Sequence, residues 1–292
     1  MKVLPIILLL TILFSGLTIH YLLPKLIIDT KGSAAMMNIV APLSDQGQQV
    51  HFVTRDSISI AGIFTKTQLP EKGTVILLHG IRGYKEHFDE LSSMLADSGY
   101  NSLAVDLRAH HQSEGDYCTF GYYEKYDIQS AVDYLLNVEK VNPNIGLWGQ
   151  SLGGAIAIQS LAVEPRLKFG IIESTFSDFD TIVRDYAEKT LGIRIPLLND
   201  YLIYRAGVIA EFEPDDVKPF EAAAAITQPV LMAHGEADRR IKIEYGKTNF
   251  NQLAAENKVF VSVPDATHID LWNVGGQAYF SEVFKFLTSL DK

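Results

Sequence analysis

The sequence predicts an α/β protein in which a mostly parallel central sheet is flanked by helices. Short apolar runs alternate with segments of helical length from residue 50 onward, and such alternation indicates βαβ units. Several of these runs are continuously apolar, as expected for strands buried on both faces of a parallel sheet. Hydrophobic residues make up 47% of the 292 residues, which is enough for one large core and argues against a disordered chain.

The order of the elements follows from these runs. The first two strands are expected as a hairpin at 50–53 and 58–64, because a polar turn at 55–57 lies between them. Further strands are expected at 74–78, 102–105, 145–148, 169–172, 230–233 and 259–263. Helices are expected at 86–98, 124–138, 152–163, 244–256 and 278–290. Because reactive groups gather beyond the carboxyl ends of parallel strands, a candidate residue should directly follow a strand.

The N-terminus differs from the rest of the chain. No charged residue occurs from 3 to 18, and the apolar character continues to residue 28. This length is sufficient to cross a membrane, because about 20 apolar residues span a bilayer core. We interpret 1–28 as an N-terminal transmembrane helix, with a signal peptide cleaved near Ser33 as the alternative. The Met-Lys start before a leucine-rich run favours a single-pass anchor with the catalytic domain on the exported side. A polar linker is expected at 29–48, and the main domain at 49–292.

Charge and cysteine content argue against several classes of function. The net charge of −10 argues against nucleic acid as a partner, because phosphate backbones select basic surfaces. Cys118 is the single cysteine, so the chain forms no intrachain disulfide and no cysteine-based zinc cluster. His110 and His111 lie near Asp106 in the sequence, but no further ligand spacing supports a metal site there.

A serine motif follows the strand expected at 145–148. The pentapeptide at 149–153 reads GQSLG and matches the G-x-S-x-G pattern of a nucleophile elbow, a tight turn from a strand into a helix. Glycines at both ends of the motif allow the flanking backbone to pack closely, and the turn lifts the Ser151 hydroxyl clear of the sheet. The alternative interpretation is a helix N-cap serine. The strand–turn–helix context favours the nucleophile.

Acyl transfer at a serine also needs two backbone N–H groups aimed at the oxyanion that develops on the carbonyl. Leu152 follows the serine and is expected to supply one of them. The second is expected from Ile81 or Arg82, in the loop after the strand at 74–78, and the sequence does not choose between the two. His79 begins this loop and is interpreted as a hydrogen-bonded structural residue.

A serine hydroxyl needs a base, and the base needs an acid that orients it. Asp238 and His268 each follow an expected strand near the end of the chain. We therefore predict Ser151, Asp238 and His268 as nucleophile, acid and base, in the chain order Ser…Asp…His. The competing candidates are Glu173, Asp265 and Asp270 for the acid and His234 for the base.

These motifs together resemble the α/β-hydrolase superfamily over nearly all of residues 50–292. The stretch 104–115 reads AVDLRAHHQSEG and is similar to the family pattern AVDxRGHGxSxG, and 228–238 is similar to the loop that carries the acid. Within the superfamily the sequence resembles small membrane-linked serine hydrolases of the Bem46 kind and serine aminopeptidase S33-type domains. Ala109 and His111 replace glycines of the family pattern, and Arg239-Arg240-Ile241 lacks the common proline after Asp238.

The resemblance implies an α/β-hydrolase fold with a small helical cap inserted at about 177–227, and a Ser151–Asp238–His268 triad without cofactor or metal. It implies a membrane-anchored serine hydrolase, of carboxylesterase or lipase-like type, that cleaves a carboxylic ester, thioester or amide. The expected partners are a small-molecule or lipid-like acyl substrate and, through the N-terminal helix, a membrane. Two alternatives stay open: a peptidase of the same fold, and a non-catalytic membrane-tethered binding protein.

Overall fold

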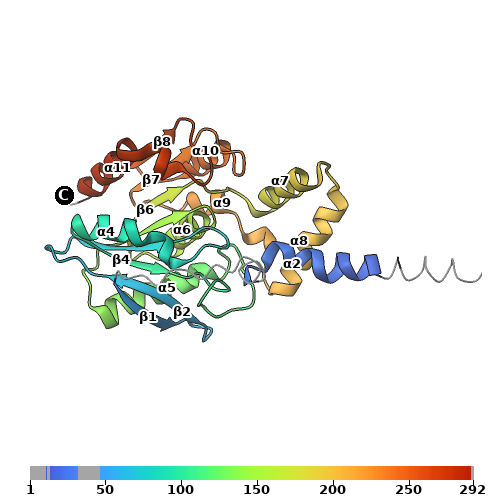
Figure 1. Ribbon diagram of the computed structural model, residues 1–292, viewed down its shortest axis with the longest axis horizontal. Coiled ribbons are helices and arrows are strands. Elements are labelled where there is room, and N and C mark those ends of the chain that lie inside the picture. The colour runs from blue at the N-terminus through green and yellow to red at the C-terminus, as the bar shows by residue number, and fades with distance from the viewer. Residues whose placement is uncertain (1–10, 12–13, 32–46, 291–292) are drawn as a thin grey trace, which may run out of the picture.

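A computed structural model describes residues 11, 14–31 and 47–290, and in these residues helices cover both faces of an eight-stranded sheet (Figure 1). The strand order is β1-β2-β4-β3-β5-β6-β7-β8. The strands from β3 to β8 pair in parallel, whereas β2 pairs antiparallel with both β1 and β4. Their bounds are β1 (Gln48–Val53), β2 (Ser59–Thr65), β3 (Gly73–Leu78), β4 (Tyr100–Val105), β5 (Ile145–Gln150), β6 (Leu167–Glu173), β7 (Val230–Gly235) and β8 (Lys258–Val263).

The predicted fold class is confirmed strand by strand. Each expected strand is present, and the expected hairpin at 50–64 is the antiparallel pair of β1 and β2. Every residue of β3, β4 and β7 is buried, which is the environment that their continuous apolar runs indicate. The hydrophobic pattern therefore located the strands along the chain and indicated which of them are buried on both faces.

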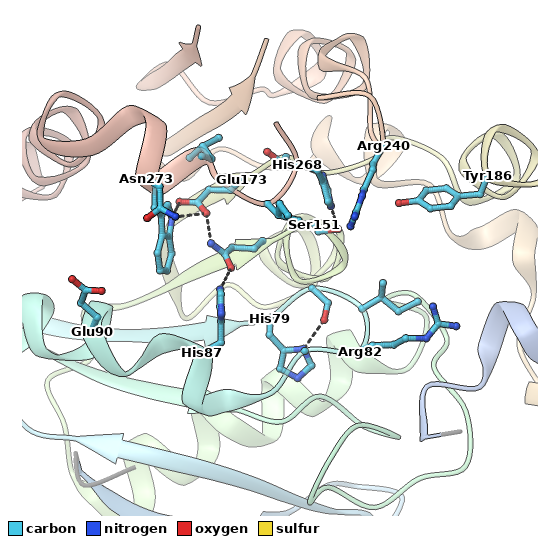
Figure 2. Close-up of a pocket in the computed structure, with 18 residues that line it drawn as sticks. His79, Arg82, His87, Glu90, Ser151, Glu173, Tyr186, Arg240, His268 and Asn273 are labelled. Carbon is cyan, nitrogen blue, oxygen red and sulfur yellow. Dashed lines mark hydrogen bonds between the residues drawn. The ribbon is translucent and has the colours of Figure 1, made fainter. Parts of the chain in front are cut away.

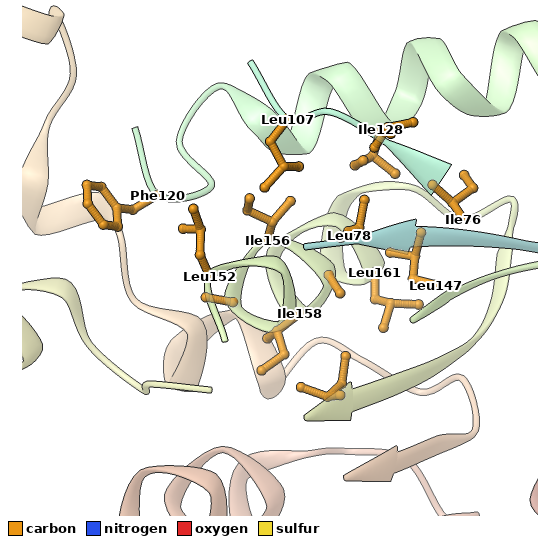
Figure 3. Close-up of a cluster of buried hydrophobic side chains, with 14 of the residues drawn as sticks. Ile76, Leu78, Leu107, Phe120, Ile128, Leu147, Leu152, Ile156, Ile158 and Leu161 are labelled. Carbon is orange, nitrogen blue, oxygen red and sulfur yellow. The ribbon is translucent and has the colours of Figure 1, made fainter. Parts of the chain in front are cut away.

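Alternate residues of a strand supply two separate cores, one on each face of the sheet. Ile76 and Leu78 of β3 pack with Ile156 in the core under α5 and α6 (Figure 3). Val75 and Leu77 point to the opposite core, which is completed by α4 and α11. Each fully buried aliphatic side chain of this kind stabilises the fold by about 1.5–3 kcal/mol. The flanking helices are α4 (Asp89–Asp97), α5 (Glu124–Tyr134), α6 (Leu152–Val163), α10 (Ile243–Gln252) and α11 (Leu271–Ser289).

Three helical segments differ from the sequence prediction in where they begin or divide. The segment expected at 86–98 consists of a short 3₁₀ helix, η2 (Lys85–Phe88), followed by α4. The segment expected at 124–138 is α5 followed by one π-helical turn, η3 (Leu135–Glu139). α11 begins earlier than the expected residue 278, and Gly276 interrupts it with the non-helical angles φ 47° and ψ −141°. That interruption breaks the helical periodicity and explains why only the later part was recognised.

A helical insertion lies between β6 and β7, where the cap was expected at about 177–227. Asp178 caps its first helix by accepting the Thr181 N–H at 2.7 Å, and Gly192 ends that helix at φ 71°. Pro196 then stands in the first turn of the next helix, where its missing N–H costs nothing. The helices are α7 (Phe179–Leu191), α8 (Pro196–Ala210), η4 (Pro214–Asp216) and α9 (Pro219–Ala223).

The N-terminal segment contacts this cap. Its described part continues through η1 (Thr18–Leu22) and α2 (Leu23–Ile28), and α2 packs against α8 (Figure 1). The Ile28 side chain is 0% exposed in the core, and the Ile28 carbonyl accepts the Cys118 N–H at 3.0 Å. The Thr30 hydroxyl donates to the Ala109 carbonyl. Residues that precede the expected domain start at 49 therefore pack against the domain.

Among the described residues, no helix is long and apolar enough to cross a membrane. Much of the transmembrane helix expected at 1–28 lies at 1–10 and 12–13, outside the described residues. The same holds for positions 32–46 of the expected linker.

Candidate active site

Ser151 occupies a strained turn between β5 and α6. Its backbone angles are φ 54° and ψ −114°, which a non-glycine residue adopts only when the surrounding structure enforces them. The two motif glycines are required by close packing: a Cβ at Gly149 would lie 2.2 Å from the Gly153 carbonyl oxygen, and a Cβ at Gly153 would lie 2.0 Å from the Leu78 carbonyl oxygen. The turn thus has the strand–turn–helix geometry that the G-x-S-x-G motif indicated.

The structure brings Ser151, His268 and Asp238 together at the carboxyl edge of the sheet, although 117 residues separate the serine from the histidine. His268 Nε2 lies 2.9 Å from Ser151 Oγ, and His268 Nδ1 lies 2.7 Å from Asp238 Oδ2. With the proton on Nδ1, the imidazole donates to the carboxylate and accepts the serine hydroxyl proton at Nε2. Each residue lies at or just beyond the end of β5, β7 or β8, as the parallel sheet requires.

The Asp238 carboxylate is held in its ionised form. Its burial raises the pKa, but hydrogen bonds from His234 and His268 outweigh this and hold the pKa of Asp238 well below its usual range. The backbone N–H groups of Arg240 and Ile241 also donate to its Oδ1, at 2.8 and 2.9 Å. An ionised carboxylate in this position fixes the orientation of the imidazole and favours its protonated form.

The candidate oxyanion donors lie around the same serine. Leu152 is the first residue of α6, and Ser151 makes no side-chain capping bond to the helix start. Ile81 and Arg82 line the pocket that contains Ser151, and a Cβ on Gly80 would lie 3.3 Å from the serine Cβ. The loop therefore approaches Ser151 closely, and both Ile81 and Arg82 stay candidates for the second donor.

His79 begins the loop after β3, and no described hydrogen bond joins it to Ser151, Asp238 or His268. Its Nε2 accepts the Leu107 N–H at 3.1 Å, so its Nδ1 carries the proton and donates to the Gly80 carbonyl at 2.7 Å. Complete burial lowers the pKa of His79 to about 3, so the ring is neutral at physiological pH. This is the structural role that the sequence analysis expected for it.

Glu173, the chief competitor for the acid, lies behind the nucleophile turn. Its carboxylate accepts hydrogen bonds from Trp148 at 2.8 Å, from Gln150 at 2.8 Å, from Trp272 at 2.9 Å and from the Tyr279 hydroxyl. Its carbonyl also accepts the Ser151 N–H at 2.8 Å. No described hydrogen bond joins Glu173 to His268; the glutamate supports the turn.

The remaining competitors have other partners. Asp270 accepts the Thr267 N–H at 2.6 Å, and Asp265 is exposed. His234 Nε2 lies 3.5 Å from Asp238 Oδ2, the oxygen that His268 also contacts, but this Nε2 donates to the Ile241 carbonyl at 2.8 Å. Among the described residues, His268 is thus the histidine that connects the serine and the aspartate.

A group of potential metal ligands lies at Glu86, Asp106 and His111, whose ligand atoms fall within 4.8 Å of one another. The buried ammonium of Lys85 already serves both carboxylates, at 3.0 Å from Glu86 and 2.9 Å from Asp106. A metal ion would have to displace this cation from a site where it is fully paired. We therefore assign the group to the support of the loop after β4.

The pocket over Ser151 has a volume of about 430 Å³, a size typical of small-molecule sites (Figure 2). It extends from the cap residue Tyr186 to the start of α11 at Trp272. Its apolar lining comes from Ile81, Tyr186, Ile269, Leu271 and Trp272, and its polar lining includes Arg82, His87, Glu90, Gln150, Arg240 and Asn273. Sequence reasoning did not identify His87, Trp272 or Asn273, because no motif surrounds them.

Comparison with known proteins places this geometry in a family. Residues 70–201 match the family model described as serine aminopeptidase, S33. The chain is 31% identical over 251 residues to 2,6-dihydropseudooxynicotine hydrolase of Paenarthrobacter nicotinovorans, covering 82% of this chain and 65% of that protein. It is 24% identical over 255 residues to protein bem46 of Schizosaccharomyces pombe, covering 84% of this chain and 77% of that protein.

A solved esterase from Pyrococcus furiosus has the same fold, with a TM-score of 0.69 and 24% identity, over 83% of this chain and 90% of that chain. The chain belongs to the α/β-hydrolase superfamily. Its hydrolase relatives support hydrolysis of an ester or amide as the reaction. Ala109 and His111, which replace family glycines, adopt φ 60° and 40°, so this α/β-hydrolase forms the left-handed turns without glycine.

Proposed function

We propose that this α/β-hydrolase is a serine hydrolase that cleaves a carboxylic ester or thioester through an acyl-enzyme on Ser151. The observation that carries the proposal is the continuous chain of contacts from Ser151 Oγ through His268 to Asp238. A helix N-cap serine needs no such partners, and its hydroxyl would bond to the helix start instead. The pocket directly above the serine hydroxyl gives a substrate carbonyl room to approach.

The mechanism follows from the proposed roles. His268 Nε2 removes the Ser151 hydroxyl proton as the oxygen attacks the carbonyl carbon, and the carbonyl π electrons move onto oxygen. The Leu152 N–H and the N–H of Ile81 or Arg82 stabilise that oxyanion. Its collapse expels the alcohol or thiol, which takes the proton from His268. A water molecule, deprotonated by His268, then attacks the acyl carbon. The bond to Ser151 Oγ breaks, the serine oxygen takes the proton back from His268, and the carboxylic acid leaves.

The alternative of an aminopeptidase needs a carboxylate for the substrate ammonium. Glu173 lines the pocket, but its oxygens already accept bonds from Trp148, Gln150, Trp272 and Tyr279. Burial also raises the pKa of Glu173, which reduces its value as a counter-ion. Glu173 is therefore a poor counter-ion for a substrate ammonium, and a peptide N-terminus would have to use the exposed Glu90 at the far end of the pocket.

Labelling with a fluorophosphonate probe tests the proposal, because the probe forms a bond only with an activated serine. We expect one labelled tryptic peptide, containing Ser151, together with hydrolysis of para-nitrophenyl esters of short acids. A folded protein that neither reacts with the probe nor hydrolyses any ester of the series would instead be a binding protein on a hydrolase scaffold.

Asp238→Asn and Glu173→Gln distinguish the two acids of the site. We expect Asp238→Asn to lower kcat by about 10³- to 10⁴-fold, because the amide no longer selects the correct imidazole tautomer. Glu173→Gln should lower Tm, because one acceptor of the buried network becomes a donor, while kcat falls less than about tenfold. Steady-state kinetics on para-nitrophenyl butyrate and thermal unfolding measure both. The reverse ranking of the two kcat values would place the acid on β6.

We also propose that the N-terminal segment holds the protein at a membrane, with the hydrolase domain on the exported side. In support, residues 3–18 carry no charge, and Phe14 on the described end of this segment is 70% exposed. The neighbouring cap helix α8 exposes Leu197, Tyr201, Tyr204 and Val208, which recur at helical spacing on one face, and exposed apolar patches mark interaction surfaces. His20 bonds to the Tyr201 hydroxyl at 2.5 Å, which joins the segment to α8.

Two truncated chains test the membrane proposal. The full chain should stay in the membrane fraction through a carbonate wash, and a chain that starts at Leu23 should be released. A chain that starts at Gln48 should also be released but should lose about 5 °C or more of Tm, because the core contribution of Ile28 is missing. Retention of all three chains in the pellet would contradict the proposal, and equal Tm values would contradict the structural role of Ile28.

A further inference from the structure

Two arginines that line the active-site pocket have no carboxylate partner. Among the described residues, the ion-paired arginines are Arg108, Arg166, Arg184 and Arg194, and neither Arg82 nor Arg240 is one of them. Both line the pocket of Ser151 and both are exposed. In a chain with 35 acidic and 25 basic residues, two unpaired cations at one pocket are available to a ligand.

Arg240 starts from the loop that carries the proposed acid. Its own N–H donates to Asp238 Oδ1 at 2.8 Å, which fixes the backbone from which its side chain extends. Figure 2 shows this side chain pointing from the loop toward Ser151, and Tyr186 pointing from the cap toward Arg240. The guanidinium therefore lies over the pocket, between the cap and the nucleophile.

Arg82 lines the same pocket, but its side chain extends from the loop after β3 toward the N-terminal segment, where its Nη2 lies 3.5 Å from the Leu26 carbonyl oxygen (Figure 2). Burial raises the pKa of the Tyr186 hydroxyl and the Asp238 carboxylate acts in the same direction, whereas the positive charges of Arg240 and Arg82 lower it. Both cations are thus close enough to influence one hydroxyl on the inner side of the cap. At the other end of the pocket lies the exposed Glu90, so the two ends carry opposite charge (Figure 2).

We propose that Arg240, with Tyr186 beside it and the charge of Arg82 at the rim of the same pocket, binds an anionic group of the substrate, a carboxylate or phosphate a few bonds from the scissile carbonyl. A guanidinium presents a planar fork of donors that matches either group, and a partly enclosed pocket strengthens the attraction. Glu90 repels the same group, so the substrate binds with its anionic end toward the cap. This inference deepens the proposed function and rests on it for the identity of the reaction.

Matched pairs of esters measure the preference. On the acyl side, para-nitrophenyl hydrogen adipate is compared with para-nitrophenyl hexanoate, in which a methyl group replaces the carboxylate. We expect Arg240→Gln to lower the anionic-to-neutral ratio of kcat/KM by about tenfold or more, mainly through KM of the anionic ester. The wild-type ratio should also fall as sodium chloride is raised, since salt screens an exposed charge pair.

A second pair of esters determines whether the acyl part or the alcohol part of the substrate carries the anionic group. On the alcohol side, para-acetoxyphenyl phosphate is compared with para-acetoxytoluene. An effect of Arg240→Gln on one pair alone assigns the anionic group to the acyl or to the alcohol part. The matched control is Arg239→Gln, because Arg239 is exposed but does not line the pocket. This control should keep both wild-type ratios, and an Arg240→Gln variant that also keeps both would overturn the proposal.

Binding to a Ser151→Ala protein separates this inference from the proposed function. Calorimetric titration compares monomethyl adipate with methyl hexanoate, with and without Arg240→Gln. If no ester is hydrolysed but Arg240→Gln weakens the binding of monomethyl adipate alone, the anion site stands and the proposed reaction fails. If esters are hydrolysed and Arg240→Gln changes neither a rate ratio nor the binding of monomethyl adipate, the reaction stands and the anion site is excluded.

Discussion

Replacement of Ser151 by alanine should lower the turnover of para-nitrophenyl butyrate by about 10⁵- to 10⁶-fold, because no other group at the turn supplies a nucleophile. The change removes one oxygen, and the strained backbone at φ 54° is maintained by the packing of the flanking glycines. We therefore expect Tm to stay within a few degrees of the wild-type value. Single-turnover kinetics on purified protein, with thermal unfolding alongside, measure both quantities.

Ser174 offers the matched control for this variant. It lines the same pocket, it also has a positive φ of 45°, and no described hydrogen bond involves its side-chain oxygen. Ser174→Ala should keep near wild-type turnover and fluorophosphonate labelling, because its hydroxyl makes no contact with His268. If Ser174→Ala lost the label while Ser151→Ala kept it, the nucleophile would be Ser174 and our assignment of Ser151 would be wrong.

The sequence predicted the arrangement of the candidate site because each residue of the site lies at or just after the end of a strand. A parallel sheet brings the carboxyl ends of β5, β7 and β8 to one edge, so the motifs that follow these strands were expected to place Ser151, Asp238 and His268 close together. The choice of Asp238 over Glu173 was harder, since both carboxylates end a strand. Their surroundings separate them: one faces an imidazole, and the other faces indole, amide and phenol donors.

The features that sequence reasoning missed depend on side chains that meet across long separations. Trp272 reaches Glu173 over 99 residues of chain, and no local pattern encodes that contact. The same limit applies to Arg240. The sequence showed that the loop after Asp238 lacks the common proline, but the direction of the Arg240 side chain over the pocket depends on the conformation of the loop after β7. The packing of Ile28 in the core was hidden by the apolar run before it, because uniform hydrophobicity indicates burial without indicating the partner.

Replacement of His268 by alanine should be nearly as severe as loss of the serine, at about 10⁴- to 10⁶-fold in kcat, because the two residues act as one unit. The Ser151→Ala/His268→Ala double variant should then be no slower than Ser151→Ala alone. A nucleophile without its base, or a base without its nucleophile, leaves the same residual catalysis from binding and the oxyanion donors.

His234→Ala is the matched comparison, because this histidine also lies beside Asp238 but does not reach the serine. Its Nε2 donates to the Ile241 carbonyl at 2.8 Å and lies 3.5 Å from the carboxylate, so its loss leaves a buried acceptor unpaired. We expect Tm to fall while kcat drops less than about 100-fold, since the bond between Asp238 and His268 remains. Thermal unfolding and steady-state kinetics on the three variants decide the assignment. An inactive His234→Ala beside an active His268→Ala would move the base to β7, where proton transfer from the Ser151 hydroxyl would require His234 to leave the Ile241 carbonyl and approach the serine.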